Sequence, residues 1–493
     1  MKMHMNIVFV SSEVFPFSKT GGLADVAGTL PVEIGNLGNN VKVFTPKYGS
    51  INETKHGLIY QEHISEIPIT VSGEIKKVHV HKAFLPNTQI EVYFIDFQPF
   101  FFRDSYYTND IDEADRFILF SKAVLEILQR IKWKPDLIHC NDWQTGLIPL
   151  YLKDNYSWDK LFHNTASLFT IHNVGYQGQF GAETLMKAEI RFEYFNNFGE
   201  VKQNDHVNFL KTGISFADII NTVSNTYAQE LLTPELSYGM DHILNYRGHD
   251  FYGILNGVDY NIWNPSTDKH IPFNYSPEDL SGKKQNKKVL CEQFNLPYDE
   301  NIPIVGIVSR LAIQKGFDLI ARSLEYLSHL PFQWIVLGAG EDYFEEMFQT
   351  FANYRPEKAA CHIGYNNDLA HLIEAGSDMF LMPSHYEPCG LNQIYSLKYG
   401  TVPIVRKTGG LSDTVKDWDE YKARGEETGN GFSFDKYDGF ALTNSVERAL
   451  NCYKNKPVWQ KIMLNGMKEN FSWHRSAEQY ALLYKKAISK VRG

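Results

Sequence analysis

Cysteine is scarce in this sequence, and its five cysteines lack the short paired spacings of zinc sites and redox motifs. Positive charge is also in deficit, because 58 acidic residues outnumber 48 basic ones and give a formal net charge of −10. General nucleic-acid binding needs a basic field that releases counterions from phosphates. The sequence therefore predicts no nucleic-acid partner and a reducing, cytoplasmic compartment.

Long apolar runs are missing as well. Residues 1–17 hold one lysine and a short apolar stretch broken by polar residues and Pro16, which predicts a first strand. We expect no signal peptide, transmembrane segment or membrane partner. The 493 residues exceed what one hydrophobic core usually holds, so two domains of roughly 200 to 250 residues and a cleft between them are predicted.

Short β-branched runs alternate with helical stretches through the first half, from NIVFVSS to YGILNGV. This alternation predicts an α/β protein with a parallel, doubly wound sheet. After the polar stretch 263–301, the pattern restarts with PIVGIVSRL and continues to TVPIVRKTGG. We take that stretch as the boundary between two domains.

One short motif occurs twice. Lys19-Thr-Gly-Gly-Leu-Ala-Asp25 recurs as Lys407-Thr-Gly-Gly-Leu-Ser-Asp413, identical at six of seven positions, and each copy lies between a strand and a helix. Paired glycines let the N–H groups of a helix start approach an anion, and Lys19 adds a positive charge that suits a diphosphate. The motif is not a P-loop, because its lysine precedes the glycines. Coincidence of glycine-rich turn chemistry is the alternative.

Two further strand ends carry groups suited to a phosphate and a sugar. Arg310 and Lys315 follow the strand PIVGIV. The arginine offers a planar fork of donors to phosphate oxygens and the lysine offers a mobile positive charge. The alternative is a solvated loop with two surface charges. Glu387 follows DMFLMPS and precedes a helix, where a carboxylate can bind sugar hydroxyls and the N–H groups after Gly390 can face phosphate. No histidine in the local sequence of Cys389 suggests a partner base, so this cysteine is assigned to packing or backbone contact.

His172 and Asp142 also follow predicted strands. His172 could donate to a sugar hydroxyl or contact the anomeric region, whereas a lone histidine is more often structural. Asp142 is a candidate sugar or acceptor ligand, and its alternative role is an N-cap for the helix around residues 146–153.

Three patterns imitate other chemistries. Asp110/Asp112 and Asp417/Asp419 resemble the Asp-x-Asp of metal-dependent glycosyltransferases. The first pair precedes an amphipathic helix and the second follows no apolar strand, so neither is expected to hold a metal. Gly338-Ala-Gly340 lacks the third glycine of a dinucleotide fingerprint and indicates a Rossmann-like turn without nicotinamide.

Taken together, KTGGLADV, HNVGYQG, SRLAIQKG and EPCGLNQ resemble, in order and spacing, the bacterial glycogen synthases and plant starch synthases. The resemblance extends to ILNGVD and the tail FSWHRSAEQYALLYKKAI. It implies a GT-B fold with Rossmann-like domains at 1–255 and 256–470, and a helix at 471–493 that crosses back to the first domain. It also implies glucose transfer from ADP-glucose to the non-reducing end of an α-1,4-glucan such as glycogen, with retention of configuration and without metal or cofactor.

The resemblance also implies roles for individual residues. The catalytic residues are His172, Arg310, Lys315 and Glu387. The donor-binding residues are Lys19, Gly21, Gly22, Asn256, Tyr365, Cys389, Gly390, Leu391, Gly409 and Gly410, of which Tyr365 would stack on adenine. Asp25 and Asp142 would contact the acceptor or sugar. Gln144 and Asn392 depart from the histidine and threonine of many relatives, which affects acceptor handling and one hydrogen bond to phosphate.

Three alternatives remain at this point. One is a GT-B transferase for another sugar or nucleotide. A second is a non-catalytic glucan-binding protein that uses its 14% aromatic residues, although glucan binding alone needs no diphosphate clamp of Lys19, Arg310 and Lys315. The third is a nicotinamide oxidoreductase, which the incomplete glycine signature disfavours.

Overall fold

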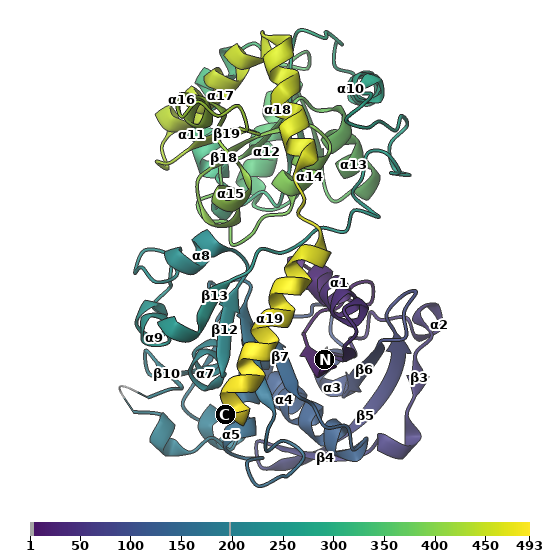
Figure 1. The fold of residues 1–493 in the computed structure, drawn as a ribbon, viewed down its shortest axis with the longest axis vertical. Helices are drawn as coiled ribbons and strands as arrows, with labels where there is room; N and C mark the ends of the chain where they lie inside the picture. The colour runs from purple at the N-terminus through teal and green to yellow at the C-terminus, as the bar shows by residue number, and fades with distance from the viewer. Residues whose placement is uncertain (1–3, 197–198) are drawn as a thin grey trace. The chain divides into compact units, whose positions relative to one another are not determined.

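The computed structural model describes residues 4–196 and 199–493, so Met1–Met3 at the start of the expected first segment lie outside the described residues. The chain forms two compact units (Figure 1). The first unit contains Met1–Val223, Ala228–Gly257 and Trp473–Gly493, and the second contains Ser224–Tyr227 and Val258–Ser472. None of the described helices is both long and apolar enough to cross a membrane.

The first unit is built on a mixed sheet with β1 (Asn6–Val10) near its middle. The strand order is β13-β12-β8-β7-β1-β2-β6-β5-β3, with β4 paired to β5. The other strands are β2 (Asn40–Pro46), β3 (Ile59–Tyr60), β4 (Ile67–Val71), β5 (Glu74–Phe84), β6 (Glu91–Asp96), β7 (Leu137–Asn141), β8 (Ala166–Ile171), β12 (Ile219–Thr222) and β13 (Phe251–Gly253). Every strand predicted in this half is present, and these strands pair parallel with one another. The antiparallel strands β3, β4 and β5 were not predicted, and β5 pairs with the predicted strand β6.

The helices of the first unit are α1 (Gly22–Asn36), α2 (Glu53–His56), α3 (Gln98–Phe101), α4 (Glu113–Arg130), α5 (Ile148–Lys153), α6 (Thr184–Lys187), α7 (Phe209–Phe216), α9 (Asp241–Tyr246) and α19 (Trp473–Arg492). A small antiparallel sheet joins β9 (Gln179–Phe180), β10 (Lys202–Gln203) and β11 (His206–Asn208). The C-terminal helix α19 packs on α1 and β8. Segments near the N-terminus and at the C-terminus of the chain therefore pack together in the same unit.

The second unit has a fully parallel sheet in the order β16-β15-β14-β17-β18-β19. Its strands are β14 (Ile304–Val308), β15 (Gln333–Gly338), β16 (Ala359–Ile363), β17 (Met379–Met382), β18 (Val402–Arg406) and β19 (Phe432–Phe434). Alternate residues of β15 pack into different core clusters, with Trp334 and Val336 in one and Ile335 and Leu337 in the other. The sheet is therefore covered on both faces, which confirms the predicted α/β, doubly wound class.

Helices cover this second sheet. They are α10 (Ser281–Gln293), α11 (Phe317–His329), α12 (Asp342–Tyr354), α13 (Asn367–Gly376), α14 (Asn392–Lys398), α15 (Gly409–Thr414), α16 (Trp418–Ala423), α17 (Gly439–Tyr453) and α18 (Lys456–Lys468), while α8 (Asn225–Glu230) begins in the segment Ser224–Tyr227. The polar stretch 263–301 lies within this unit and contains α10. Its Trp263 ring stacks on His371 and Tyr395 at centroid distances of 3.7 and 3.8 Å, so the stretch packs against the unit and is not a free linker.

Candidate active site

In each unit, some of the predicted site residues follow the two strands between which the strand order reverses. In the first unit the reversal lies between β1 and β7, and the loop with Lys19 follows β1 while Asp142 follows β7 directly. In the second unit it lies between β14 and β17, followed by the loops with Lys315 and Glu387. Ligands of open α/β sheets bind outside the carboxyl ends of the strands at such a switch point. The sheet topology thus supports both groups of residues as ligand sites.

The first copy of the repeated motif is open. Gly22 begins α1, Gly21 precedes it in an extended conformation, and a Cβ at either position would meet no heavy atom within 4 Å. Lys19 is exposed, and its Nζ lies 2.7 Å from Oδ1 of Asp25 in the first turn of α1. Burial raises the pKa of Asp25 despite the opposing effect of Lys19. An anion can approach the N–H groups of this helix start without displacing a side chain.

The second copy is closed, although its sequence is almost the same. A Cβ on Gly409 would lie 1.9 Å from the carbonyl oxygen of Glu387, and one on Gly410 would lie 2.0 Å from that of Cys389. The N–H of Gly410 donates to the Glu387 carbonyl at 3.1 Å. Lys407 pairs with Glu420 and Asp435. The predicted donor residues Gly409 and Gly410 therefore pack directly under the loop with Glu387, and the Gly410 amide is engaged within the protein.

Lys315 and Glu387 form the centre of the site in the second unit. The Lys315 Nζ lies 2.8 and 2.7 Å from the two carboxylate oxygens of Glu387, which is 5% exposed. Ser384 Oγ donates to the same carboxylate at 3.0 Å. Gly316 has φ 81°, and a Cβ there would lie 2.1 Å from the Pro383 carbonyl, so glycine allows the two loops to approach. The carboxylate is held by a cation and a hydroxyl from neighbouring strand ends.

The other predicted site residues of the second unit lie on loops that follow its strands. Arg310 is exposed, and its Nη2 donates to Oε1 of Gln314 at 2.9 Å. Tyr365 follows β16, and its ring is 83% exposed and available for stacking. Cys389 is buried, Leu391 is half-buried, and Gly390 has φ 70°. Asn392 at the start of α14 donates through Nδ2 to the Val308 carbonyl at the end of β14.

Asp142 has an unusual backbone. Its φ of 57° and ψ of 178° lie in a region that is populated almost only by glycine, and such strain concentrates at functional sites. The side chain accepts the N–H of His172 at 2.7 Å and makes no cap for the 3₁₀ turn at Trp143–Thr145. The helix expected around residues 146–153 is α5, and its N-cap residue is Leu147, so the N-cap alternative is wrong for Asp142. Burial raises the pKa of this carboxyl to about 7, although hydrogen bonds from the N–H groups of His172 and Asn173 act to lower it.

His172 is held as a neutral imidazole. Its Nε2 lies 2.9 Å from Oδ1 of Asn141, whose own Nδ2 donates to the Val10 carbonyl at 2.9 Å. Asn141 Oδ1 is thus an acceptor, so the proton is assigned to His172 Nε2 and Nδ1 carries a lone pair. Burial lowers the pKa of His172 to about 3. The remaining ring nitrogen can accept a hydrogen bond but cannot donate one at neutral pH.

Sequence reasoning missed one buried acidic residue. Glu13 is 2% exposed in the loop after β1 and accepts hydrogen bonds from Thr20 and Tyr107. An acidic residue in the first loop after a strand was the signal that could have identified it. Two buried amides are also notable, because Oδ1 of Asn256 and Oε1 of Gln144 have no partner among the described residues. Such groups can accept from a ligand hydroxyl.

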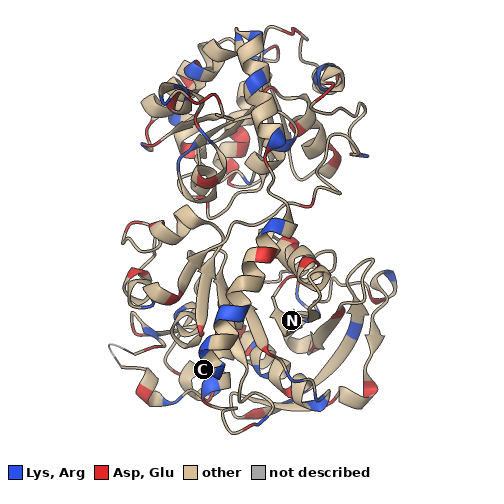
Figure 2. Cartoon of the chain, in the orientation of Figure 1, with Lys and Arg blue, Asp and Glu red and all other residues tan. Residues whose placement is uncertain are grey.

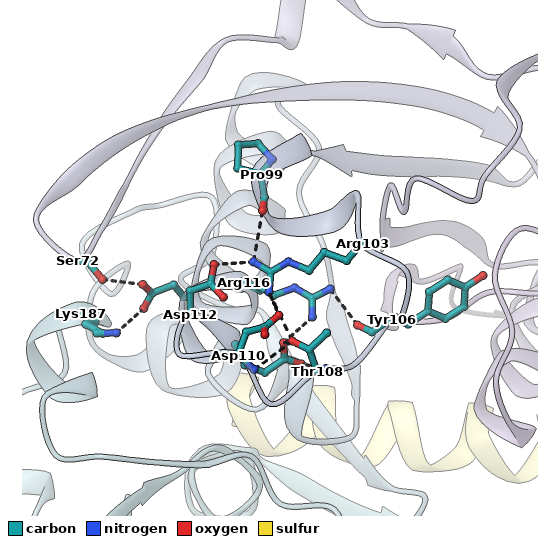
Figure 3. Close-up of polar contacts among 11 residues, drawn as sticks. Ser72, Pro99, Arg103, Tyr106, Thr108, Asp110, Asp112, Arg116 and Lys187 are labelled. Atoms are coloured by element: carbon teal, nitrogen blue, oxygen red, sulfur yellow. Dashed lines mark hydrogen bonds and ion pairs between the residues drawn. The ribbon is translucent and has the colours of Figure 1, made fainter.

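The Asp-x-Asp pairs are bound by arginines. Figure 3 shows Asp110 and Asp112 directed toward Arg103, which contacts them at 2.7 and 2.5 Å. Asp417 caps α16 by accepting the N–H groups of Asp419 and Glu420, and it pairs with Arg448 at 3.1 Å. These carboxylates have structural roles. Within residues 4–196 and 199–493, no cluster of three metal-ligating side chains is found.

Lys and Arg are interspersed with Asp and Glu over both units (Figure 2). Positive charge at the two sites is therefore supplied by single side chains, namely Lys19 in the first unit and Arg310 and Lys315 in the second. This pattern fits a small anionic ligand better than a polyanion.

Two family models match the chain. The model of the starch synthase catalytic domain matches residues 6–246, and that of glycosyl transferases group 1 matches residues 292–462. The glycogen synthase of Desulforudis audaxviator is 44% identical over 505 residues, which cover 99% of this chain and 97% of the relative. The glycogen synthase of Thermotoga maritima is 42% identical over 490 residues, with 99% and 100% covered.

Solved structures give the same result. The catalytic domain of starch synthase IV from Arabidopsis thaliana, solved bound to ADP and acarbose, superposes with a TM-score of 0.90 at 33% identity. The match covers 99% of this chain and 100% of that one. Sucrose-phosphate synthase from Thermosynechococcus elongatus shares the fold, with a TM-score of 0.59 at 16% identity. That match covers 99% of this chain and 100% of the other one.

Proposed function

The chain belongs to the family of glycogen synthases and starch synthases and is a hexosyltransferase of the GT-B class, and on this premise we propose the donor, acceptor and residue roles. The donor is ADP-glucose, and the acceptor is the non-reducing end of an α-1,4-glucan such as glycogen. The transfer retains the α configuration. A cytoplasmic location is part of the proposal, and it is supported by the five cysteines being thiols.

The observation that carries the proposal is the pair of Lys315 and Glu387 at the switch point of the second unit, with Arg310 on the same loop after β14 as Lys315. Lys315 and Arg310 would stabilise the negative charge that grows on the leaving diphosphate. Glu387 orients Lys315 and has lone pairs that can accept from glucose hydroxyls. In the first unit, Lys19 and the N–H groups at Gly21 and Gly22 would bind a diphosphate. Tyr365 would stack on the adenine.

The first unit would bind the sugar and the acceptor. Neutral His172 would accept a hydroxyl hydrogen bond at Nδ1, which differs from the donor role expected from its sequence. Asn256 would contact the transferred glucose through its unpartnered Oδ1. Asp142 and Asp25 would bind the acceptor or sugar. The conformation of Asp142, strained and fixed by the His172 amide, supports such a role.

Retention by glycosidases normally uses a carboxylate nucleophile and a second carboxyl group about 5 Å away. Glu387 is unsuited to nucleophilic attack, because both of its oxygens already contact Lys315. The proposed reaction therefore takes place on one face of the sugar. The bond from C1 to the diphosphate oxygen breaks, the bond from C1 to the acceptor 4-oxygen forms, and the hydroxyl proton passes to the leaving diphosphate.

The direct test incubates the protein with glycogen and either ADP-glucose or UDP-glucose, and measures nucleotide release and glucose incorporation. We expect faster incorporation from ADP-glucose and an α-linked product. Faster initial rates with UDP-glucose would contradict the donor assignment. Trapping a glucosylated Glu387 or Asp142 at a competent rate would contradict the mechanism.

A further inference from the structure

A buried carboxylate lies directly beneath the open motif of the first unit. Glu13 is 2% exposed, and its Oε1 accepts the hydroxyl of Thr20 at 2.6 Å while its Oε2 accepts the N–H of the same residue. Thr20 is itself exposed and immediately precedes Gly21 and Gly22 at the start of α1. Both polar donors of Thr20 are thus fixed by one side chain.

The other end of this contact is the loop that contains Tyr107. Oε1 of Glu13 also accepts the hydroxyl of Tyr107 at 2.6 Å, and the Tyr107 oxygen lies 2.8 Å from Ser12 Oγ. Arg103 precedes Tyr107 in the chain and binds Asp110 and Asp112, which follow it, so the loop is bridged around Tyr107. Arg116 donates to the Tyr106 carbonyl at 2.9 Å (Figure 3). Glu13 therefore fastens the motif loop to a loop that is itself held by arginines.

The burial of Glu13 costs folding free energy, so fold stability by itself does not explain a carboxylate at this position. Within the described parts of the chain, no lysine or arginine forms an ion pair with Glu13, and its side-chain partners are hydroxyl groups and one backbone N–H. A buried carboxylate without a cation carries a desolvation cost that neutral donors offset only in part. An uncharged side chain would avoid that cost. The charged acceptor instead gives strong, directional hydrogen bonds to one exposed residue.

We propose that Glu13 is a positioning residue for the nucleotide-sugar diphosphate. By holding the N–H and hydroxyl of Thr20, it fixes the path of the chain into Gly21 and Gly22, so that the first N–H groups of α1 and Lys19 keep their orientation toward the anion. The inference rests on the proposed diphosphate role of this motif. It adds a residue that does not itself touch the substrate.

The test compares variants of the full chain by donor and acceptor kinetics. In Glu13→Ala, we expect the KM for ADP-glucose to rise about tenfold or more, because a charge-assisted anchor is lost, with the KM for glycogen changed less than about twofold. Glu13→Gln can still accept from the Thr20 N–H and donate to the Tyr107 oxygen, so it should restore the donor KM to within about threefold. Glu62→Ala, at an exposed glutamate of the same unit, is the matched control.

A second measurement needs no substrate. Hydrogen exchange at the amides of residues 20–24 should be faster in Glu13→Ala than in the wild type and near wild type in Glu13→Gln. If Glu13→Ala does not fold, Thr20→Val removes only the hydroxyl and should raise the donor KM by about threefold, compared with Thr54→Val at an exposed threonine.

The outcomes separate the two proposals. An unchanged donor KM in Glu13→Ala, or in Thr20→Val where that variant replaces it, overturns the positioning role. So does a rise confined to the glycogen KM, or a Glu13→Gln variant as impaired as Glu13→Ala. A wild-type chain that transfers glucose from no nucleotide donor overturns the proposed function instead, and the exchange rates then still report whether Glu13 orders the loop.

Discussion

Nδ1 of His139, at the centre of the first sheet, lies 2.8 Å from the hydroxyl of Tyr484 in α19. The other ring nitrogen contacts Thr170 Oγ1 at 2.6 Å, and Thr170 donates to Asn221, whose amide donates to the hydroxyl of Tyr480. All of these side chains are buried. The C-terminal helix is thus fixed to the sheet by a closed polar network as well as by apolar packing.

This network predicts a loss of stability in acid. Burial holds the pKa of His139 well below its usual value, so the folded protein keeps the ring neutral while the unfolded chain takes up a proton below about pH 6.5. The unfolded state then binds more protons, and stability falls as the pH falls. At pH 5.5 this single group should lower the free energy of unfolding by about 1.4 kcal/mol. His139→Gln should be less stable at pH 7, and its deficit should shrink at pH 5.5 in parallel urea titrations.

Substitution of Lys315 and of Arg310 should lower turnover alike but should differ in its effect on the stability of the fold. We expect Lys315→Ala and Arg310→Ala each to reduce turnover about 10²-fold, because each cation stabilises the leaving diphosphate. Lys315→Ala should also destabilise the protein by about 3 kcal/mol, because it leaves buried Glu387 without its cation. Arg310 is exposed, so its variant should unfold as the wild type does. Near-normal turnover of both variants would refute the assignment.

Asp142→Asn should gain stability and lose activity. The folded-state pKa of about 7 is raised above the unfolded value, so the carboxyl's contribution to stability is complete below the unfolded pKa and is lost as the pH rises to 7. An amide does not ionise, and the variant should therefore be more stable than the wild type at pH 8, by up to about 4 kcal/mol. Its glucan transfer should decline. Equal melting temperatures of the two proteins at pH 8 would contradict this.

The two copies of the repeated motif offer a matched pair of substitutions. Gly22→Ala enters open space at a helix start and should leave the melting temperature unchanged or slightly raised. Gly410→Ala would place a Cβ 2.0 Å from the Cys389 carbonyl oxygen and should destabilise the second unit by about 3 kcal/mol. Thermal unfolding of both variants tests the contrast. An equal loss in both would show that the copies are used alike.

Removal of divalent cations should leave activity intact, because side-chain cations are proposed to stabilise the diphosphate. Assays with and without a chelator test this directly. Asp112→Asn should lower stability by about 1 kcal/mol through the lost contact with Arg103, without creating a metal requirement. Complete loss of activity on chelation, restored by Mg²⁺ or Mn²⁺, would return Asp110/Asp112 or Asp417/Asp419 to consideration.

The sequence by itself determined the α/β class, the predicted strands and the motifs at their carboxyl ends. These features depend on local patterns, since apolar runs, glycine turns and helix starts are set by neighbours along the chain. The strand β19, the antiparallel strands β3 to β5 and the helix α10 within a polar stretch were missed. Their segments are short or polar, and pairing with distant residues decides their structure.

Only the tertiary structure decided how the candidate residues are used. Strand order brings the loops of Lys315 and Glu387 together across 72 positions of sequence. Packing opens the motif at Gly21 and closes its copy at Gly409, although both copies read alike. The contact of Asp142 with His172 and that of Glu13 with Tyr107 likewise join segments 30 and 94 positions apart in the chain. Local sequence places a residue at a strand end, but its partners, exposure and protonation depend on which distant segments pack beside it.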